Sequence, residues 1–502
     1  MLKEALFNSD RYQYTMSKIH LKTGKDKSRA IFNFFFRKAP DGNNWAIVAG
    51  MNEFLNLIKT MNSNEYTQQE KKDIFRKILT GKNSNEAEIE NICEKLAAMK
   101  YTGNVYSMRE GEIVFPNEPI ITLEGPLVET QILETPLLSI MNHACLIATK
   151  ASRIVRAAKG IPVSSFGSRR AHGPWSSILG DKAAYIGGCS SVSNIMTDYL
   201  YDIQCTGTMA HSFIESYAPP SKDNEYLAFK DFVQYNDEGN NILLIDTFDV
   251  LKSGLPNAIK VFKEFDLEKR YLETGDGYGV RLDSGDLAYL SKKCREELNK
   301  NGLEHARIIV TNGLDEYSIK ELLDQGAEVD GFGVGDAIAT SKHNPCFGGV
   351  FKLVEIDNIP TIKLSEDTIK VINPGFQNVY RIYQGSEAKG DLIALRSNDS
   401  DAIKLNAGDD ITIRAEFDKR QQTTFSKGSY TYRELLLQVV KDGEILGEFD
   451  VEKARAYRQE VLDSFSESCT RLLNPHIYKV DISNDLYDLK MKTIYNIENS
   501  LK

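Results

Sequence analysis

Between about residue 140 and residue 350, one pattern recurs along the chain: a short apolar run, a polar or glycine-rich turn, and an amphipathic helix pattern. The apolar runs end near residues 163, 206, 245, 282, 310 and 334. In the helix patterns apolar residues recur every three or four positions, as at Leu287, Leu290, Cys294 and Leu298. Strands that alternate with helices in this way predict a parallel sheet with right-handed crossover connections.

The polar and glycine-rich motifs of this region all follow the apolar run of their unit. They are FGSRRAHG (166–173), GTMAHSF (207–213), DTFD (246–249), RLDSGD (281–286), TNGLDE (311–316) and GFGVGD (331–336). This placement favours an irregular TIM-like α/β barrel, because the carboxyl ends of all its strands converge on one mouth. The alternative is a doubly wound sheet, which would gather only the motifs that flank its switch point.

The two ends of the chain follow a different pattern. We expect strands at 30–36, 120–123, 350–356, 361–364, 379–383 and 411–414, a helix at 53–61, and a charged helical tail from 451. The fold class predicted is therefore α/β, with a barrel at 139–352 inserted in a second α/β domain built from both ends of the chain. That second domain comprises 1–138 and 353–502, where strands return to the N-terminal part before the tail.

Composition and charge restrict the function classes. The 502 residues are 41% hydrophobic and 26% charged, with a net charge of -10, which is typical of a globular protein. Seven cysteines without a C-x-x-C pair argue against disulfides and zinc, and no signal peptide or membrane span is recognisable, so we expect a cytoplasmic protein. Without a Lys/Arg stripe, we expect no nucleic-acid partner, although a pocket for an anionic small molecule remains compatible with the charge.

An aromatic ring and two guanidinium groups follow the first strand of the predicted barrel, at Phe166, Arg169 and Arg170. Arginine forks bind carboxylate or phosphate oxygens, and a phenylalanine face stacks on an aromatic ring, so an aromatic acid would suit this motif. In the alternative interpretation Phe166 belongs to the core and the arginines pair with acids such as Asp181.

A histidine, His211, follows a small-residue turn at the next strand end. It could act as a general base, a nucleophile or a phosphate acceptor, or it could be a hydrogen-bonded structural residue. Asp246, Asp249, Asp283 and Asp286 add carboxylates at the same mouth, and Arg281 adds a cation. Carboxylates could hold Mg²⁺ or stabilise a ribosyl cation, but helix N-capping is the preferred interpretation for Ser284 and Asp286.

The glycine-rich run 331–335 resembles a dinucleotide fingerprint only weakly, because it closes the series of strands. A phosphate cradle made of backbone N–H groups is the better interpretation.

Taken in order, the motifs resemble those of the nicotinate phosphoribosyltransferases, which are type II phosphoribosyltransferases. The resemblance covers most of residues 5–385. Besides the motifs above, it includes SDRYQYTM (9–16), FNFFFR (32–37), AYIGG (184–188), GVRLDSGDL (279–287), KLSED (363–367) and NPGFQNVYRIY (373–383). It implies formation of nicotinate mononucleotide and pyrophosphate from nicotinate and phosphoribosyl pyrophosphate, with Mg²⁺, in NAD salvage.

The resemblance also implies a role for individual residues. A phosphorylated His211 would couple ATP hydrolysis to the transfer, and Phe166 and a partner subunit's tyrosine, equivalent to Tyr12, would enclose the pyridine ring in a homodimer with shared sites. Arg169, Thr208 and Arg281 would hold carboxylate or phosphate oxygens, Asp246 and Asp283 the ribose or Mg²⁺, and Gly333 and Gly335 the 5-phosphate. Asp336 departs from the family pattern, which often has a hydroxyl residue there; an acid beside a phosphate is repulsive unless Mg²⁺ or a lysine such as Lys342 intervenes.

Two other functions remain open. The same chemistry could act on nicotinamide or quinolinate, but residues 188–191, Gly-Cys-Ser-Ser, lack the aspartate of nicotinamide-using relatives, which favours the acid. Alternatively, a non-catalytic homologue could bind a pyridine nucleotide and report NAD status. The intact His211, Arg281 and Asp283 argue against that alternative.

Overall fold

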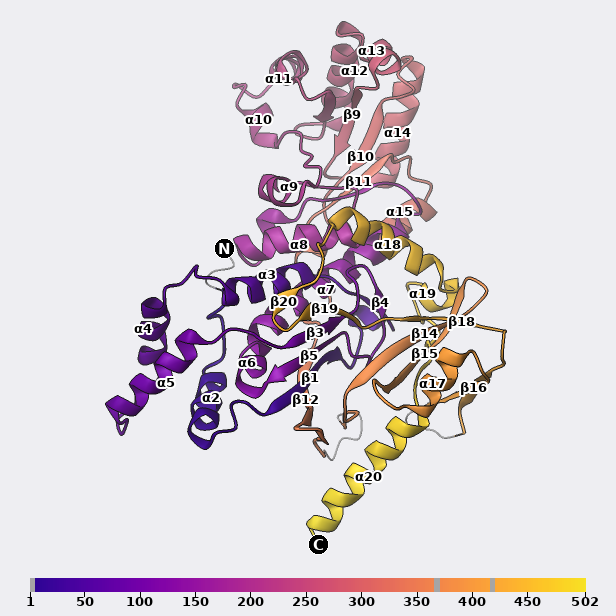
Figure 1. Cartoon of the computed structure of the whole chain (residues 1–502). Helices are drawn as coiled ribbons and strands as arrows, with labels where there is room; N and C mark the ends of the chain where they lie inside the picture. The colour runs from indigo at the N-terminus through magenta and orange to yellow at the C-terminus, as the bar shows by residue number, and fades with distance from the viewer. Residues whose placement is uncertain (1–4, 365–370, 416–419) are drawn as a thin grey trace. The chain divides into compact units, whose positions relative to one another are not determined.

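The computed structural model describes residues 5–364, 371–415 and 420–502. The chain forms two compact units, one from Met1–Leu146 together with Cys346–Lys502 and the other from Ile147–Pro345. We call them unit 1 and unit 2. Unit 1 is thus assembled from both ends of the chain, and unit 2 from the continuous segment between them (Figure 1).

Unit 2 contains a six-stranded sheet in the order β7-β6-β11-β10-β9-β8. Every neighbouring pair is parallel. The strands are β6 (Val163–Ser165), β7 (Ser191–Val192), β8 (Asn240–Leu244), β9 (Gly277–Leu282), β10 (Arg307–Val310) and β11 (Gly331–Val334). The strand order has two ends among the described residues, so the sheet is an open half-barrel, extended at β7 by one parallel bridge between Val192 and Cys205.

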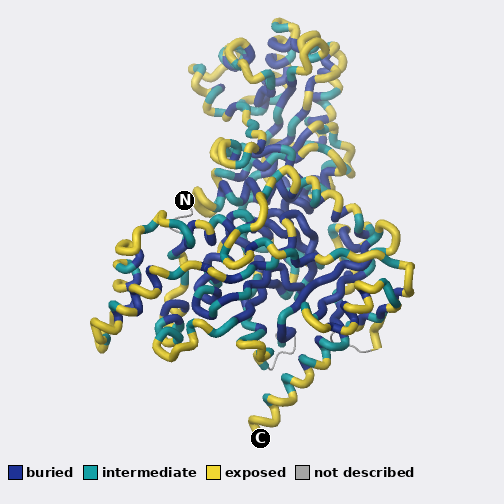
Figure 2. The backbone as a smooth tube through the Cα atoms, in the orientation of Figure 1, coloured by how far each residue is buried: buried dark blue, intermediate teal, exposed yellow. Residues whose placement is uncertain are grey.

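Helices separate these strands along the chain, as crossover connections require. They are α8 (Pro174–Ile186), α9 (Ile195–Tyr201), α10 (His211–Glu215), α11 (Lys222–Tyr235), α12 (Leu255–Glu264), α13 (Leu267–Thr274), α14 (Leu287–Lys300) and α15 (Glu316–Asp324); α16 (Asp336–Ala339) follows the last strand, β11. All four residues of β11 are buried, which is typical of a strand in a sheet covered on both faces (Figure 2). The predicted α/β class is confirmed.

Unit 1 contains a seven-stranded sheet in the order β13-β12-β1-β5-β3-β19-β20. Its inner strands are β12 (Gly349–Ile356), β1 (Arg29–Phe36), β5 (Ile121–Pro126), β3 (Asn104–Ser107) and β19 (Leu437–Lys441). Its edge strands are β13 (Ile359–Pro360) and β20 (Glu444–Ile445). β1 pairs antiparallel with both β5 and β12, so segments more than 300 residues apart share one sheet. The rings of Phe32 and Phe351 stack across that pair with centroids 4.7 Å apart.

The helix expected at 53–61 is present and is one of several helices in unit 1. They include α2 (Arg11–Thr23), α3 (Met51–Asn62), α4 (Gln68–Leu79), α5 (Glu86–Ala98) and α6 (Leu127–Gln131). α7 (Glu134–Ala157) runs from unit 1 into unit 2. The stretch Leu127–Ala157 is long and apolar enough to cross a membrane by length and composition, but 67% of its most apolar window is buried, as in a core helix.

Most strands after residue 376 form a further six-stranded sheet, in the order β17-β16-β21-β15-β14-β18. Its strands are β14 (Gln377–Gln384), β15 (Glu387–Leu395), β16 (Ile411–Arg414), β17 (Gln422–Phe425), β18 (Thr431–Glu434) and β21 (Val480–Ile482). Two expectations were wrong here. Residues 361–364 form no strand, and the tail contains β21 between α18 (Val451–Asp463) and α20 (Asn484–Ser500), because β21 pairs in parallel with β15.

Candidate functional site

The candidate site lies at the carboxyl ends of the parallel strands of unit 2. Phe166 follows β6, Asp246 follows β8, Asp283 follows β9, Thr311 follows β10, and Gly335 follows β11. The segment 207–211 follows the Cys205 bridge and leads into α10. The prediction that these motifs meet at one edge of the sheet is confirmed by the contacts between them.

His211 begins α10, and its ring lies among three polar side chains. Its Nδ1 is 3.1 Å from the hydroxyl of Thr247, and its Nε2 is 3.8 Å from Oδ2 of Asp283 and 4.0 Å from Oδ1 of Asp246. The His211 side chain is 39% exposed, so a ligand can reach it. The ring is therefore held on one side by a hydroxyl and faces two carboxylates on the other.

The two carboxylates are held in different ways. Asp246 has a side chain only 1% exposed, and its Oδ2 accepts hydrogen bonds from the backbone N–H of Asp283 and the hydroxyl of Ser284. Its Oδ1 is buried and accepts no hydrogen bond from the described residues, which is costly unless a ligand or ion supplies a partner. Asp283 is 30% exposed and accepts a 2.5 Å hydrogen bond from the hydroxyl of Thr311.

Arg281, in β9, joins this strand to the segment 207–211, which ends at His211. Its Nη1 donates to the hydroxyl of Thr208 at 2.9 Å, and its Nη2 donates to the carbonyl of Met209 at 2.8 Å. Burial lowers the pKa of Arg281, the carboxylates of Asp283 and Asp246 raise it, and Arg169 lowers it again. Arg169, in the exposed turn after β6, adds a second positive charge at this end of the sheet, which favours an anionic ligand.

The ring of Phe166 lies against Gly333 of β11. A Cβ atom on Gly333 would be 2.5 Å from Cδ2 of that ring and 2.7 Å from Cγ2 of Thr311. Only glycine leaves this space, so Gly333 is required for the position of the ring. A Cβ atom on Gly335 would be 3.3 Å from the carbonyl oxygen of Phe166, so the two glycines bound the same turn.

The arginines of the FGSRR motif are exposed, and neither makes a hydrogen bond or ion pair with a residue that the structure describes. Asp181 instead accepts hydrogen bonds from Ser165 at 2.7 Å and Ser168 at 2.9 Å. The alternative in which Asp181 pairs with the arginines is therefore wrong. The guanidinium groups of Arg169 and Arg170 remain available to a ligand.

Two of the acidic residues have structural partners. Asp286 caps α14 by accepting from the N–H of Tyr289, as predicted, and Asp249 accepts from the N–H groups of Leu251 and Lys252, which lower its pKa. Ser284, by contrast, does not cap a helix but binds Asp246. Asp336 begins the short α16, and its carboxylate makes no hydrogen bond or ion pair with the described part of the chain, Lys342 included.

Sequence reasoning missed the hydroxyls that hold the ionisable groups: Thr247 on His211, Ser284 on Asp246 and Thr311 on Asp283. All three belong to motifs singled out in the sequence, and their position at strand ends was the available signal. Tyr12 lies in α2 of unit 1 and is 48% exposed. Of the KLSED motif, residues 365–367 lie outside the described residues.

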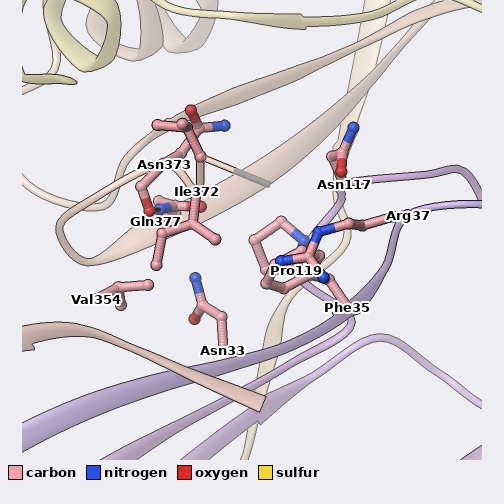
Figure 3. A pocket seen from close by; sticks show the side chains of 10 residues that line it. Asn33, Phe35, Arg37, Asn117, Pro119, Val354, Ile372, Asn373 and Gln377 are labelled. Atoms are coloured by element: carbon pink, nitrogen blue, oxygen red, sulfur yellow. Dashed lines mark hydrogen bonds between the residues drawn. The ribbon is translucent and has the colours of Figure 1, made fainter. Parts of the chain in front are cut away.

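Unit 1 has a hollow of its own, of about 390 Å³ including the space open to solvent. Figure 3 shows side chains from β1, the 117–119 loop and the 371–377 segment around it. The guanidinium of Arg37 lies over the Phe35 ring, 5.5 Å from its centroid, and Asn33 accepts a hydrogen bond from Thr122. The hollow is thus polar and positively charged on one side.

The donor set of the unit 2 site fits a divalent cation that also binds phosphates. Among the described residues, no group of three or more His, Cys, Asp or Glu side chains could hold a metal by itself. The buried Oδ1 of Asp246, which has no hydrogen-bond partner among the described residues, and the partly exposed carboxylate of Asp283 are two hard oxygen ligands. Mg²⁺ commonly binds one or two carboxylates and completes its shell with water and substrate phosphates.

Comparison with known proteins places the chain among characterised enzymes. Models of the nicotinate phosphoribosyltransferase N-terminal and C-terminal domains match residues 7–142 and 376–490. Nicotinate phosphoribosyltransferase of Bacillus subtilis is 36% identical over 99% of this chain and 96% of its own length, and nicotinate phosphoribosyltransferase 2 of Arabidopsis thaliana is 32% identical over 96% and 92%.

Solved structures show the same fold. Human nicotinic acid phosphoribosyltransferase superposes with a TM-score of 0.78 at 24% identity, over 97% of this chain and 99% of the human chain. Nicotinate-nucleotide pyrophosphorylase from Pyrococcus furiosus superposes with a TM-score of 0.65 at 25% identity, over 92% and 95%. The sequence relationship extends over almost the whole chain, and on that ground the chain belongs to the nicotinate phosphoribosyltransferase family.

Proposed function

We propose that this protein transfers the 5-phosphoribosyl group of phosphoribosyl pyrophosphate to the ring nitrogen of nicotinate, forming nicotinate mononucleotide and pyrophosphate for NAD biosynthesis in the cytoplasm. The relatives named for this activity span nearly the whole chain and support the reaction. The observation that carries the proposal is the grouping of His211 with Asp246 and Asp283, at the same sheet edge as Arg281 and Phe166.

Substrate binding is assigned to the groups at that edge. The Phe166 ring supplies a flat face for the pyridine ring, and Arg169, with Arg281 held by Thr208, supplies positive charge for carboxylate or phosphate oxygens. We assign the 5-phosphate to the end of β11 and the turn after it, at Gly333 and Gly335. Asp336 directly follows Gly335 in sequence. Its negative charge would repel a phosphate bound here unless Mg²⁺ or another cation lies between them.

In the transfer, the lone pair of the pyridine nitrogen forms a bond to C1 of the ribose while the bond from C1 to the pyrophosphate oxygen breaks. The bonding electrons leave with pyrophosphate, so positive charge develops on the sugar and negative charge on the leaving group. The carboxylates of Asp246 and Asp283 stabilise the sugar, and the arginines stabilise the pyrophosphate. No proton transfer is required at the ring nitrogen.

ATP hydrolysis is coupled through His211. The imidazole attacks the γ-phosphorus of ATP, ADP leaves, and the phosphoryl group stays on the ring until water removes it as inorganic phosphate. The exposed face of His211 allows ATP to approach, and Thr247 orients the ring. Mg²⁺ held at Asp246 and Asp283 would neutralise phosphate charge, which the two carboxylates by themselves would repel.

The functional unit in this proposal is a homodimer. Tyr12 is half-exposed in unit 1, and we propose that it completes the pyridine site of a partner subunit. An exposed tyrosine is suited to such a place, because its ring is apolar and its hydroxyl tolerates water.

The test is product formation by the purified protein with phosphoribosyl pyrophosphate and Mg²⁺. Nicotinate, nicotinamide and quinolinate are offered separately, each with and without ATP. We expect nicotinate mononucleotide, formed faster with ATP. Product from nicotinamide or quinolinate alone would overturn the substrate assignment, and tight mononucleotide binding without any turnover would indicate a nucleotide sensor.

A further inference from the structure

Asp181 is a buried carboxylate that the proposed reaction does not use. It lies in α8, is 4% exposed, and accepts hydrogen bonds from Ser165 and Ser168. No cation among the described residues pairs with it. Burial raises the pKa of Asp181, which the two serine hydroxyls lower only in part.

A buried carboxylate with only neutral donors costs stability compared with a neutral side chain of the same size. Fold stability by itself therefore gives no reason for an acid at this position. Costly polar groups that persist in a protein interior commonly serve a functional site.

The two serines flank Phe166, the residue to which the proposed function assigns the pyridine ring. Ser165 is the last residue of β6, Ser168 begins the helical turn Ser168–Arg170, and Phe166 and Gly167 lie between them. Asp181 binds one serine with each of its oxygens, so a single side chain holds both ends of the turn.

The other side of the turn is fixed by β11 and α16. The N–H of Phe166 donates to the carbonyl of Val334 at 2.8 Å. A Cβ atom on Gly167 would be 2.5 Å from Cβ of Ala339 and 2.7 Å from the carbonyl oxygen of Gly335. The turn is thus held between Asp181 on one side and a close backbone contact on the other.

This restraint opposes a local repulsion. The positive charge of Arg169 lowers the pKa of Arg281, and no carboxylate is paired with Arg169 among the described residues. Two guanidinium groups near each other favour an outward movement of the turn when no anion is bound. A turn held at both ends keeps the guanidinium groups in place before the substrate binds. Less conformational entropy is then lost on binding.

We propose that Asp181 is a positioning residue that holds Phe166 and Arg169 ready for the substrate by binding the hydroxyls of Ser165 and Ser168. This inference rests on the proposed function, since it assigns Phe166 and Arg169 to the pyridine acid. It concerns a side chain that touches no substrate itself.

The experiment compares Asp181→Asn, Ser168→Ala and the double variant with the unaltered enzyme. Asn has nearly the size of Asp, but it carries one neutral oxygen and an NH₂ group in place of two ionised oxygens. It therefore no longer offers each serine hydroxyl a charged acceptor. We expect the KM for nicotinate, and the Kd for nicotinate mononucleotide measured by calorimetry, to rise about tenfold, while kcat changes less than about threefold and the melting temperature does not fall. The double variant is expected to equal the single ones, because both remove the same restraint.

Asp330→Asn is the matched control. Asp330 also accepts from two groups in unit 2, Arg295 and the N–H of Ile308, but it precedes β11 and so lies at the opposite end of the sheet. Its variant is expected to keep the KM for nicotinate. A lower melting temperature for Asp181→Asn with an unchanged KM would show a purely structural role and overturn the inference. Absence of nicotinate turnover by the unaltered enzyme would instead refute the proposed function.

Discussion

The Nε2 atom of His211 lies 3.8 Å from Oδ2 of Asp283, a residue 72 positions further along the chain. Parallel pairing of β8 with β9 brings the second carboxylate, Asp246, to the same imidazole. The histidine thus faces two acids and is oriented by Thr247 from its other nitrogen.

Replacing His211 by Ala should abolish stimulation of product formation by ATP and leave a slow, ATP-independent transfer. The reason is that the imidazole is the proposed phosphate acceptor, whereas the transfer itself needs only the carboxylates and arginines. Initial rates with and without ATP measure the effect. His305→Ala is a control histidine variant, because His305 is bound to Glu268 instead. An undiminished ATP effect in His211→Ala would refute the role of the histidine.

Asp246→Asn should lower kcat by about 100-fold while changing the KM for nicotinate little, because Asp246 acts on the developing charge of the sugar and on Mg²⁺. A chelator should lower the rate of the unaltered enzyme, with recovery on addition of Mg²⁺. Ser284→Ala removes only one hydrogen bond to Asp246 and should have a smaller effect on kcat. A normal kcat for Asp246→Asn would exclude the carboxylate from the reaction.

Gly333→Ala should raise the KM for nicotinate at least about tenfold, since the added methyl group occupies the space of the Phe166 ring and displaces it. Gly313→Ala is the control variant, because Gly313 also lies in a loop near this edge and no atom lies within 4 Å of the added methyl group. The positive φ of 64° at Gly313 adds backbone strain in this control. Equal KM values for Gly333→Ala and the unaltered enzyme would contradict stacking on Phe166.

The shared site can be tested by complementation. Tyr12→Ala and His211→Ala subunits, each defective, are co-expressed with different tags. If Tyr12 completes the partner's site, each mixed dimer contains one intact site, and random mixing restores about a quarter of the ATP-stimulated activity. Dimers purified through both tags should have about half the activity of the unaltered dimer. No recovery in these mixed dimers would place Tyr12 in the site of its own subunit.

Stability of unit 2 should depend on Glu316, which is fully buried and accepts from Lys150 at 2.9 Å and Arg153 at 3.1 Å. Glu316→Ala leaves two buried cations without this acid and should lower the free energy of unfolding by about 3–5 kcal/mol, as measured by denaturant titration. Asp324→Ala, which removes an exposed pair with Lys320, should cause little change. Equal stability of both variants would mean that the two cations find other partners.

The sequence by itself determined the class of the fold and the edge of the sheet at which the candidate site lies. Local periodicity identifies strands and helices, and parallel strands necessarily bring their carboxyl ends to one edge, so the order of the motifs was sufficient to group His211, Asp246 and Asp283. The capping role of Asp286 also followed from local sequence, because a cap involves only the next three residues.

Only the tertiary structure decided which partners these groups have. The hydroxyl partners of His211 and Asp283, the two serines on Asp181, the open edges of the half-barrel and the pairing of β21 with β15 all join segments separated along the chain. Such contacts depend on strand register and on the packing of helices against the sheet. A sequence pattern reports the spacing of residues within one element, and it carries little information on these long-range relationships.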